Sequence, residues 1–328
     1  STEQAASLLN AQVSTLSSSQ LVGLETQDLV VLSTDQVRAL SQDQVQSLST
    51  DQMVALTTAQ VGGMTTNQIN GLSSDQVAAL STDQLAALST AQVKALSTQA
   101  IEGLSSTAMS SLSTGQLSAL TTSQVAALSV EQMQSITATA LPSMSTAQVS
   151  SLSDAQLGAL SAPQWAALST TQFAALSSSQ LNGLSTSSVA ALTTAHLAAL
   201  TTEQLQGMRN DQITALEVGD LNAMGTQVIS GMSTEQVAAL SSGQVAALTT
   251  SLLSAMSSEQ VGALQTDDMA VLSSAQMAAL SSSQLSAIDA DHLQAISSSG
   301  LAGLSTAQIQ GLSTLQISSL SADQVLHL

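Results

Sequence analysis

The 328-residue sequence has no cysteine and no tyrosine, and aromatic residues make up only 1% of it. Without cysteine the chain has no disulfide and no thiolate to serve as a metal ligand or nucleophile. Tryptophan and phenylalanine occur once each, so almost no aromatic bulk is present to fill a wide core. We therefore expect a thin core that is shared between neighbouring repeats.

Basic residues are nearly absent as well: Lys and Arg total 3 against 22 Asp and Glu, giving a net charge of −19. Clustered Lys and Arg supply the affinity for nucleic-acid phosphates and for anionic lipids, so we expect neither partner. The apolar runs are short, as in residues 29–32, whereas about 20 apolar residues are needed to span a bilayer. We therefore predict no membrane insertion and no signal peptide.

What the sequence does have is an unbroken eight-residue repeat. Its 328 residues form 41 octads (41 × 8 = 328), and every residue whose number is a multiple of eight is Leu, Ile or Met. We number the octad positions p1 to p8; the consensus is Ser/Thr, Thr/Ser, variable, Gln, aliphatic, variable, Ala/Gly/Ser, Leu, as in SSDQVAAL at residues 73–80. Such self-similarity indicates a solenoid, in which each unit packs on its neighbours.

Each octad carries the sequence signature of a helix start. Position p1 is Ser, Thr or Asp in 35 of the 41 octads, and p4 is Gln in 29. Together they match the capping box, in which the p1 hydroxyl accepts the p4 N–H and the p4 side chain reaches back to the p1 N–H. This pattern assigns a glutamine such as Gln76 the role of a helix cap, worth on the order of 1 kcal/mol.

The placement of charge supports the same interpretation. Of the 22 acidic residues, 14 occupy p3 and 21 lie within p1 to p4, with Glu102 the exception. Arg38 and Lys94 lie at p6, while Arg209 departs from the pattern. Carboxylates are favoured at the first turn of a helix and cations at the last, so the distribution predicts a helix in every octad.

The period excludes two other folds. In one continuous α-helix the apolar stripe would drift by about 80° per octad, and in a strand p5 and p8 would point to opposite faces. We therefore predict an all-α fold: a tight α-solenoid, or superhelical rod, of 41 short capped two-turn helices. The number of octads per coil turn stays open. Residues 1–328 are expected to form one continuous solenoid and, because polar end caps are lacking, a segment of a longer array.

Several residues depart from the consensus. Trp165 and Phe173 at p5 are interpreted as core residues. Pro142 at p6 should weaken its helix, whereas Pro163 at p3 suits a first turn. His196 and His292 replace the p4 Gln, and we interpret them as substitutes in the cap because no second metal ligand accompanies either one at a suitable spacing.

Acidic residues are densest at Asp267 and Asp268 and at Asp289 and Asp291. We interpret them as surplus acids at helix N-termini; calcium binding by Asp289 and Asp291 stays open, because no known calcium loop is present. No group of residues is marked out as nucleophile, base and orienting residue. The sequence predicts no enzyme, no cofactor, and no catalytic, cofactor-binding or metal-binding residues.

The Ser and Thr residues at p1 and p2 are expected to form hydroxyl ladders along the solenoid. Helix capping is sufficient to explain them, and O-glycosylation or the ordering of water at an ice surface are the alternatives. The free interchange of Thr and Ser at p2 weakens the ice-binding alternative.

Runs such as LSSDQVAALSTDQLAALSTAQVKAL at residues 72–96 resemble octapeptide tracts of large, repetitive bacterial secreted and surface proteins of the adhesin type. The resemblance implies an extracellular or cell-surface location and a stalk that spaces other domains. We therefore expect a non-enzymatic structural rod acting as stalk, spacer or filament segment. The alternative is a binding module that uses its acidic or Ser/Thr ladders on polysaccharide, a cell or ice. Self-association, end to end or side by side, and any surface ligand stay open.

Overall fold

The computed structural model describes all 328 residues, and each octad forms one short helix. Forty are α-helices, one is a 3₁₀ helix, and no strand is present. The chain divides into two compact units, Ser1–Leu168 and Ser169–Leu328. The all-α solenoid is confirmed, whereas the single continuous domain over residues 1–328 stays a prediction.

The helices of the first unit are α1 Thr2–Ala6, α2 Asn10–Val13, α3 Ser18–Val22, α4 Thr26–Val30, α5 Thr34–Ala39, α6 Gln42–Gln46, α7 Thr50–Ala55, α8 Thr58–Gly63, α9 Thr66–Asn70, α10 Ser74–Ala79, α11 Thr82–Ala86, α12 Thr90–Ala95, α13 Thr98–Glu102, α14 Ser106–Ser111, α15 Thr114–Ala119, α16 Thr122–Ala126, α17 Val130–Ser135, η1 Leu141–Ser143, α18 Thr146–Ser150, α19 Asp154–Gly158 and α20 Ala162–Ala167.

The helices of the second unit are α21 Thr170–Ala174, α22 Ser178–Asn182, α23 Thr186–Val189, α24 Thr194–Ala198, α25 Thr202–Gln206, α26 Asn210–Thr214, α27 Val218–Ala223, α28 Thr226–Ser230, α29 Thr234–Ala238, α30 Ser242–Ala247, α31 Thr250–Ala255, α32 Ser258–Gly262, α33 Thr266–Ala270, α34 Ser274–Ala279, α35 Ser282–Ser286, α36 Ala290–Ala295, α37 Ser298–Leu301, α38 Thr306–Gln310, α39 Thr314–Ser319 and α40 Ala322–Leu326.

The predicted capping box forms at the start of most helices. In α10, Ser73 Oγ accepts the Gln76 N–H at 3.2 Å, and Gln76 Oε1 accepts the Ser73 N–H at 3.1 Å. The helix ends at Leu80, whose φ of −64° and ψ of 135° are extended. No residue has a positive φ, so extended residues at p8 and p1 redirect the chain, without a left-handed glycine.

The α-helices have four to six residues, or about one and a half turns at 3.6 residues per turn. The predicted short helices of roughly two turns are thus confirmed, with a length slightly under two turns. The physical reason is that p8 and p1 are both extended, which leaves at most six residues of each octad for the helix.

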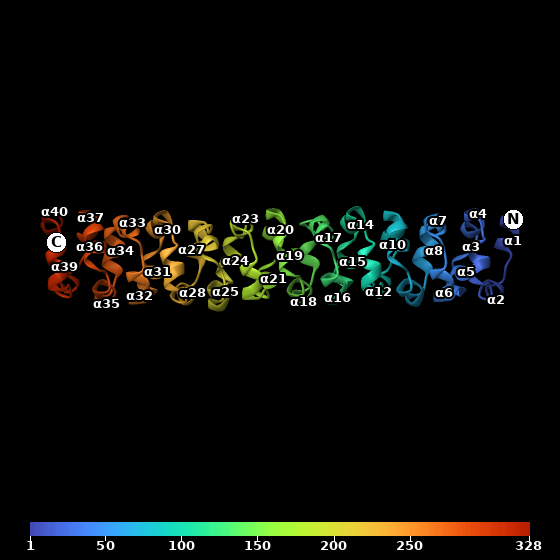
Figure 1. Cartoon of the computed structure of the whole chain (residues 1–328), viewed down its shortest axis with the longest axis horizontal. Helices are drawn as coiled ribbons and strands as arrows, with labels where there is room; N and C mark the ends of the chain where they lie inside the picture. Colours follow the sequence, from blue (N-terminus) through green and yellow to red (C-terminus); the bar gives the residue numbers. More distant parts are fainter. The chain divides into compact units, whose positions relative to one another are not determined.

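Each helix packs against the helix three octads along the chain. In the first unit α4 contacts α7 and α7 contacts α10, and in the second α24 contacts α27 and α27 contacts α30. Figure 1 shows α4 and α7 next to each other at the upper edge of the first unit. Glutamine side chains also reach helices four octads back, as Gln60 reaches Leu32, so one coil turn holds between three and four octads.

The sequence left the number of octads per coil turn open. A helix of about six residues is only about 9 Å long, so several of them are needed to surround the core. This result depends on the helix length, which the repeat period alone does not fix.

The core consists of the side chains at p5 and p8, with p4 buried beside them. Val61 at p5 is 0% exposed, whereas Val54 at p6 is 56% exposed. Trp165 and Phe173 are both fully buried, which confirms that they fill the core. None of the helices has the length and the apolar character needed to cross a lipid bilayer.

The two prolines behave as predicted. Pro142 lies in η1, the only octad without an α-helix, because proline removes a backbone donor and crowds the preceding turn. Pro163 occupies the second position of α20, which keeps six helical residues.

Small residues at p7 allow close approach between helices three octads apart. A Cβ added to Gly103 would lie 2.0 Å from the Ser74 carbonyl oxygen, and one added to Gly303 would lie 2.1 Å from that of Ser274. The backbones of α13 and α10 therefore meet at a distance that excludes a side chain at Gly103.

We predict that Gly103→Ala destabilises the contact between α13 and α10 by about 1–3 kcal/mol, because the new methyl group overlaps backbone atoms. Gly115→Ala is the matched control: its Cβ would meet only ordinary contacts, the nearest at 3.8 Å, and the loss of glycine should stabilise the helix by up to about 1 kcal/mol. Amide hydrogen exchange in α10, α13 and α15 measures both. Equal effects of the two substitutions would contradict this packing.

Candidate functional site

The side-chain amide of the p4 glutamine joins two helices that are four octads apart. Gln60 Oε1 accepts the N–H of Thr57 at 2.7 Å, which caps the start of α8. Gln60 Nε2 donates to the carbonyl oxygens of Leu29 at 2.8 Å and Leu32 at 2.7 Å, at the end of α4. The side chain is only 2% exposed, so the whole amide is used inside the coil.

This bridge repeats along both units. At each p4 glutamine from Gln36 to Gln164 and from Gln204 to Gln324, Nε2 donates to the carbonyl oxygen 28 residues earlier at 2.6–3.0 Å. The last carbonyls of a helix have no partner within it. The glutamine of a later turn supplies the missing donor.

The sequence interpretation identified only half of this role. It assigned Gln76 to its own helix start, yet Gln76 Nε2 also donates to Val45 O at 3.0 Å and Leu48 O at 2.9 Å. One signal was present in the sequence: a capping box accepts Glu as readily as Gln, but no p4 residue is Glu. A carboxylate lacks the donor that the second half of the bridge requires.

The two p4 histidines differ in their contacts. His196 Nδ1 accepts the Thr193 N–H at 3.2 Å, so its predicted role in the cap is confirmed; its ring stacks on Phe173 with centroids 4.9 Å apart. His292 Nδ1 instead lies 2.8 Å from Asp289 Oδ1. There the Asp289 carboxylate makes the cap, accepting the His292 N–H at 2.9 Å, so the prediction that His292 replaces the amide was wrong.

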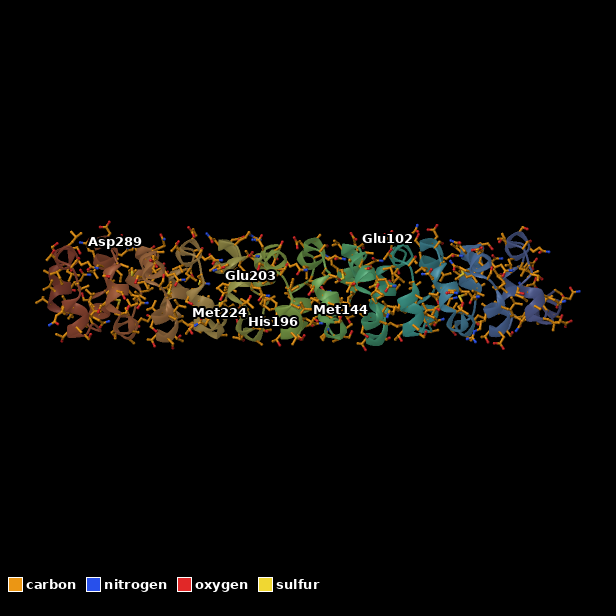
Figure 2. All side chains as sticks on the ribbon, turned by 90° about the horizontal axis from the view of Figure 1, so that it is seen from below. Glu102, Met144, His196, Glu203, Met224 and Asp289 are labelled. Atoms are coloured by element: carbon orange, nitrogen blue, oxygen red, sulfur yellow. The ribbon has the colours of Figure 1, made fainter.

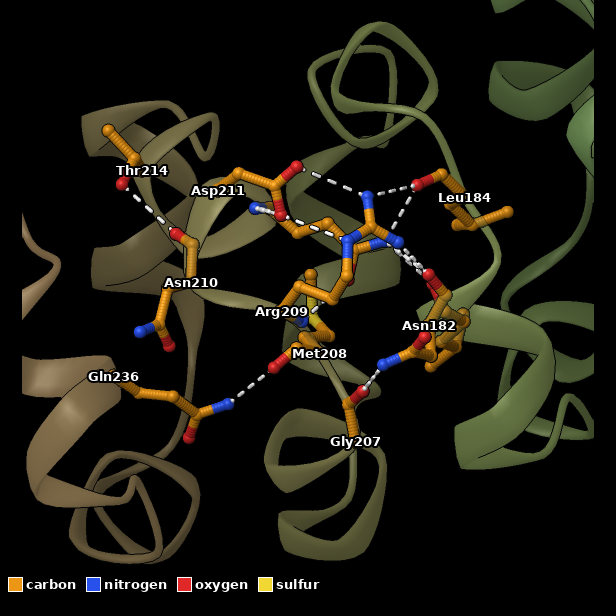
Figure 3. A network of polar contacts seen from close by, with 11 residues as sticks. Asn182, Leu184, Gly207, Met208, Arg209, Asn210, Asp211, Thr214 and Gln236 are labelled. Carbon is orange, nitrogen blue, oxygen red and sulfur yellow. Dashed lines mark hydrogen bonds and ion pairs between the residues drawn. The ribbon is translucent and has the colours of Figure 1, made fainter.

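Arg209 replaces the p1 hydroxyl and adds a second bridge to α22. Its guanidinium donates to the carbonyl oxygens of Asn182 and Leu184, to which Gln212 Nε2 also donates. Figure 3 shows these bonds together with the ion pair to Asp211, in which Arg209 Nε lies 3.0 Å from Oδ1. The guanidinium lowers the pKa of the Asp211 carboxyl. This departure from the consensus therefore strengthens cohesion between turns.

The acidic residues divide into exposed and buried groups. Asp289 lies at the outer edge of the coil in Figure 2, and the hydrogen bond from the His292 N–H lowers its pKa. Asp268 is 2% exposed, and burial raises its pKa, although Oδ2 accepts the Gln265 N–H at 2.8 Å. Burial likewise raises the pKa of Asp220.

Among the 328 residues, no group of three or more His, Asp and Glu side chains is arranged to hold a metal ion. Asp289 is the N-cap of α36 and Asp291 lies in its first turn. Asp267 and Asp268 occupy the first turn of α33. Their interpretation as acids at helix starts is thus confirmed.

Comparison with protein families gives one result. The profile of the ALTTAQ repeat matches residues 21–58, 54–82, 77–114, 141–170, 165–194, 189–218, 213–250 and 261–298. The matches that begin at positions 141, 165, 189 and 213 follow one another at intervals of three octads, which equals the spacing of contacting helices. No curated protein matches the chain.

We predict that Gln60→Glu destabilises the packing of α8 on the first coil turns by about 2–4 kcal/mol at pH 7, because a buried carboxylate then faces two carbonyl oxygens. This destabilisation should be smaller at acid pH, where the protonated carboxyl group of the new glutamate can donate a hydrogen bond. Hydrogen exchange in α4 and α8 at pH 4.5 and pH 7 measures it.

Gln20→Glu is the matched control. Gln20 caps its own helix, with Oε1 accepting the Ser17 N–H at 2.8 Å, but its side chain is exposed and its hydrogen bonds are to Ser17 alone. A carboxylate there should be neutral or slightly stabilising. Equal losses at Gln20 and Gln60 would contradict the donor role of the p4 amide.

Proposed function

We propose that this chain, which belongs to the ALTTAQ repeat family, is a non-enzymatic structural spacer. The observation that carries the proposal is the bridge from p4 glutamines to the helix four octads back, as from Gln60 to Leu32. Through this bridge, the buried side-chain amide of one octad binds an earlier coil turn of the same chain. Every added octad of this kind repeats the same bonds, and the length of the array is set by the number of octads.

The composition supports a role outside the cell, at a bacterial surface, as a stalk that separates other domains. The chain has no cysteine to be oxidised, and its positions p1 to p3 present hydroxyl and carboxylate groups to solvent. A net charge of −19 opposes binding to nucleic acid. Whether the array also associates with itself is tested by the light scattering described next.

We predict that duplicating residues 73–128, which are seven octads, lengthens the protein by about two coil turns, or roughly 18 Å at about 9 Å between packed helices. Small-angle X-ray scattering measures the maximum dimension, and light scattering in the same samples gives the oligomeric state. An unchanged maximum dimension in a folded, monomeric protein would contradict the spacer.

The control duplicates residues 73–124 instead. That insert is half an octad shorter, so the second half of the chain loses its octad register, and the glutamines near the junction lose their carbonyl partners. We expect helices near the junction to be lost, so that the helical circular dichroism per residue decreases. The increase in length should be irregular. If both duplications gave the same increase, the register of the bridges would not determine length.

For the cellular location, we expect antibodies raised against the chain to label intact source cells, and external protease to remove the label. Permeabilised cells provide the control for antigen that lies inside. Labelling that appears only after permeabilisation would contradict the surface location while leaving the spacer role intact.

A further inference from the structure

The p4 positions that lack glutamine contain two matched pairs of ionisable residues. His196 and Asp220 lie at p4 three octads apart, and so do Asp268 and His292. The helices that carry them are in contact, α24 with α27 and α33 with α36. Only two histidines lie at p4, and each has a p4 aspartate on the neighbouring coil turn.

The other large replacements of the p4 glutamine are paired in the same way. Val228 and Leu252 are likewise three octads apart, both are buried, and their helices α28 and α31 are in contact. Asp28, which is only half-buried, is the one large residue without such a partner. An apolar residue thus accompanies an apolar one, while each histidine accompanies an acid.

Burial makes the ionised aspartates unfavourable. Asp220 is 6% exposed, Asp268 is 2% exposed and His196 is 2% exposed, while the His292 side chain is 19% exposed. A carboxylate at p4 cannot donate to the carbonyl oxygens four octads back, as the amide does. A proton on the carboxyl group restores a donor, and a proton on the imidazole supplies a positive charge nearby.

We propose that His196 with Asp220, and His292 with Asp268, are two electrostatically coupled acid–base pairs on neighbouring coil turns, and that the contact between these turns is firmest at acid pH. Loss of the proton from the buried aspartate leaves a carboxylate without a donor in the coil, and the contact between the two turns loosens.

The direction of the effect follows from the aspartates. Burial raises the pKa of Asp220 and Asp268, while the neighbouring histidine opposes that increase. A group whose pKa is higher in the folded state than in the unfolded state stabilises the fold at low pH. That contribution is lost as pH increases through the raised pKa.

One further charged group faces the first pair. Glu217, the N-cap of α27, raises the pKa of Asp220. The other helices that contact α24 and α27, namely α21 and α30, carry no charge. Glu217 therefore adds to the effect of burial on this aspartate.

More acids surround the second pair. Asp267, Asp289 and Asp291 lie on the same two helices or at their caps, and Asp289 Oδ1 lies 2.8 Å from His292 Nδ1. The helices α30 and α39, which also pack there, are uncharged. The octads four places away from Asp268 and His292 bear further acids at their outward p3 positions: Glu235, Glu259 and Asp323. Every charged group around this pair is thus acidic, and like charges nearby favour the protonated form of the Asp268 carboxyl group.

Nuclear magnetic resonance titration of ¹³C-labelled aspartate carboxyl groups tests the pairing. His196→Gln should raise the midpoint of Asp220 by about one pH unit and leave Asp268 unchanged, whereas His292→Gln should do the reverse. Asp220→Asn and Asp268→Asn identify the two signals. If neither midpoint moves, or if both move in each variant, the pairing is overturned.

Hydrogen exchange tests the consequence for the coil. After correction for intrinsic rates, α24 and α27 should be less protected at pH 7.5 than at pH 5.5. The double variant His196→Gln/Asp220→Gln restores the consensus at both positions and should remove this difference, while α5 and α8, whose p4 residues are Gln36 and Gln60, should show none in either protein. A difference that persists in the double variant, or that is absent in the unmodified chain, would overturn the proposal.

Discussion

The side-chain amide of the p4 glutamine, which recurs in most octads, holds this fold together. The p4 glutamine uses its oxygen to cap the helix that contains it and its nitrogen to cap the end of a helix four octads earlier, as Gln60 does between α8 and α4. A short helix has as many unpaired carbonyls at its end as it has unpaired N–H groups at its start. The amide, with one acceptor and two donors, serves both kinds of end.

The bridge also determines the size of the cooperative unit. Helices of four to six residues are too short to persist alone, since isolated helices shorter than about 12–15 residues are marginal in water. The bond from Gln60 to Leu32 spans 28 residues, so no octad has its full set of partners until the chain has passed more than one coil turn. In most linear repeats each unit depends on its immediate neighbours; here the coupling runs to units three and four positions away.

The features predicted from sequence are those whose causes lie within about four residues along the chain. The cap between Ser73 and Gln76, the acids of the first helical turn and the buried p5 side chains such as Trp165 all belong to this group. The number of octads per turn was not predicted, because it depends on the extended backbone at p8 and p1. The second half of the glutamine bridge was missed for a similar reason: its acceptors are main-chain carbonyls, which every residue type carries. The pairing of His196 with Asp220 becomes visible only when contacts at three octads are known.

Cohesion is spread so widely that single bridges can be absent. Ala100 and Ala108, at p4 in successive octads, are buried without any side-chain donor, and α13 and α14 still form and pack. Position p4 is therefore both buried and tolerant of change, a combination that p5 and p8 do not share because they require bulky apolar groups. An array made of near-identical units can thus acquire a local property at p4 without losing its fold. The two histidine–aspartate pairs lie at this position, where burial makes a change of charge affect the contact between two turns.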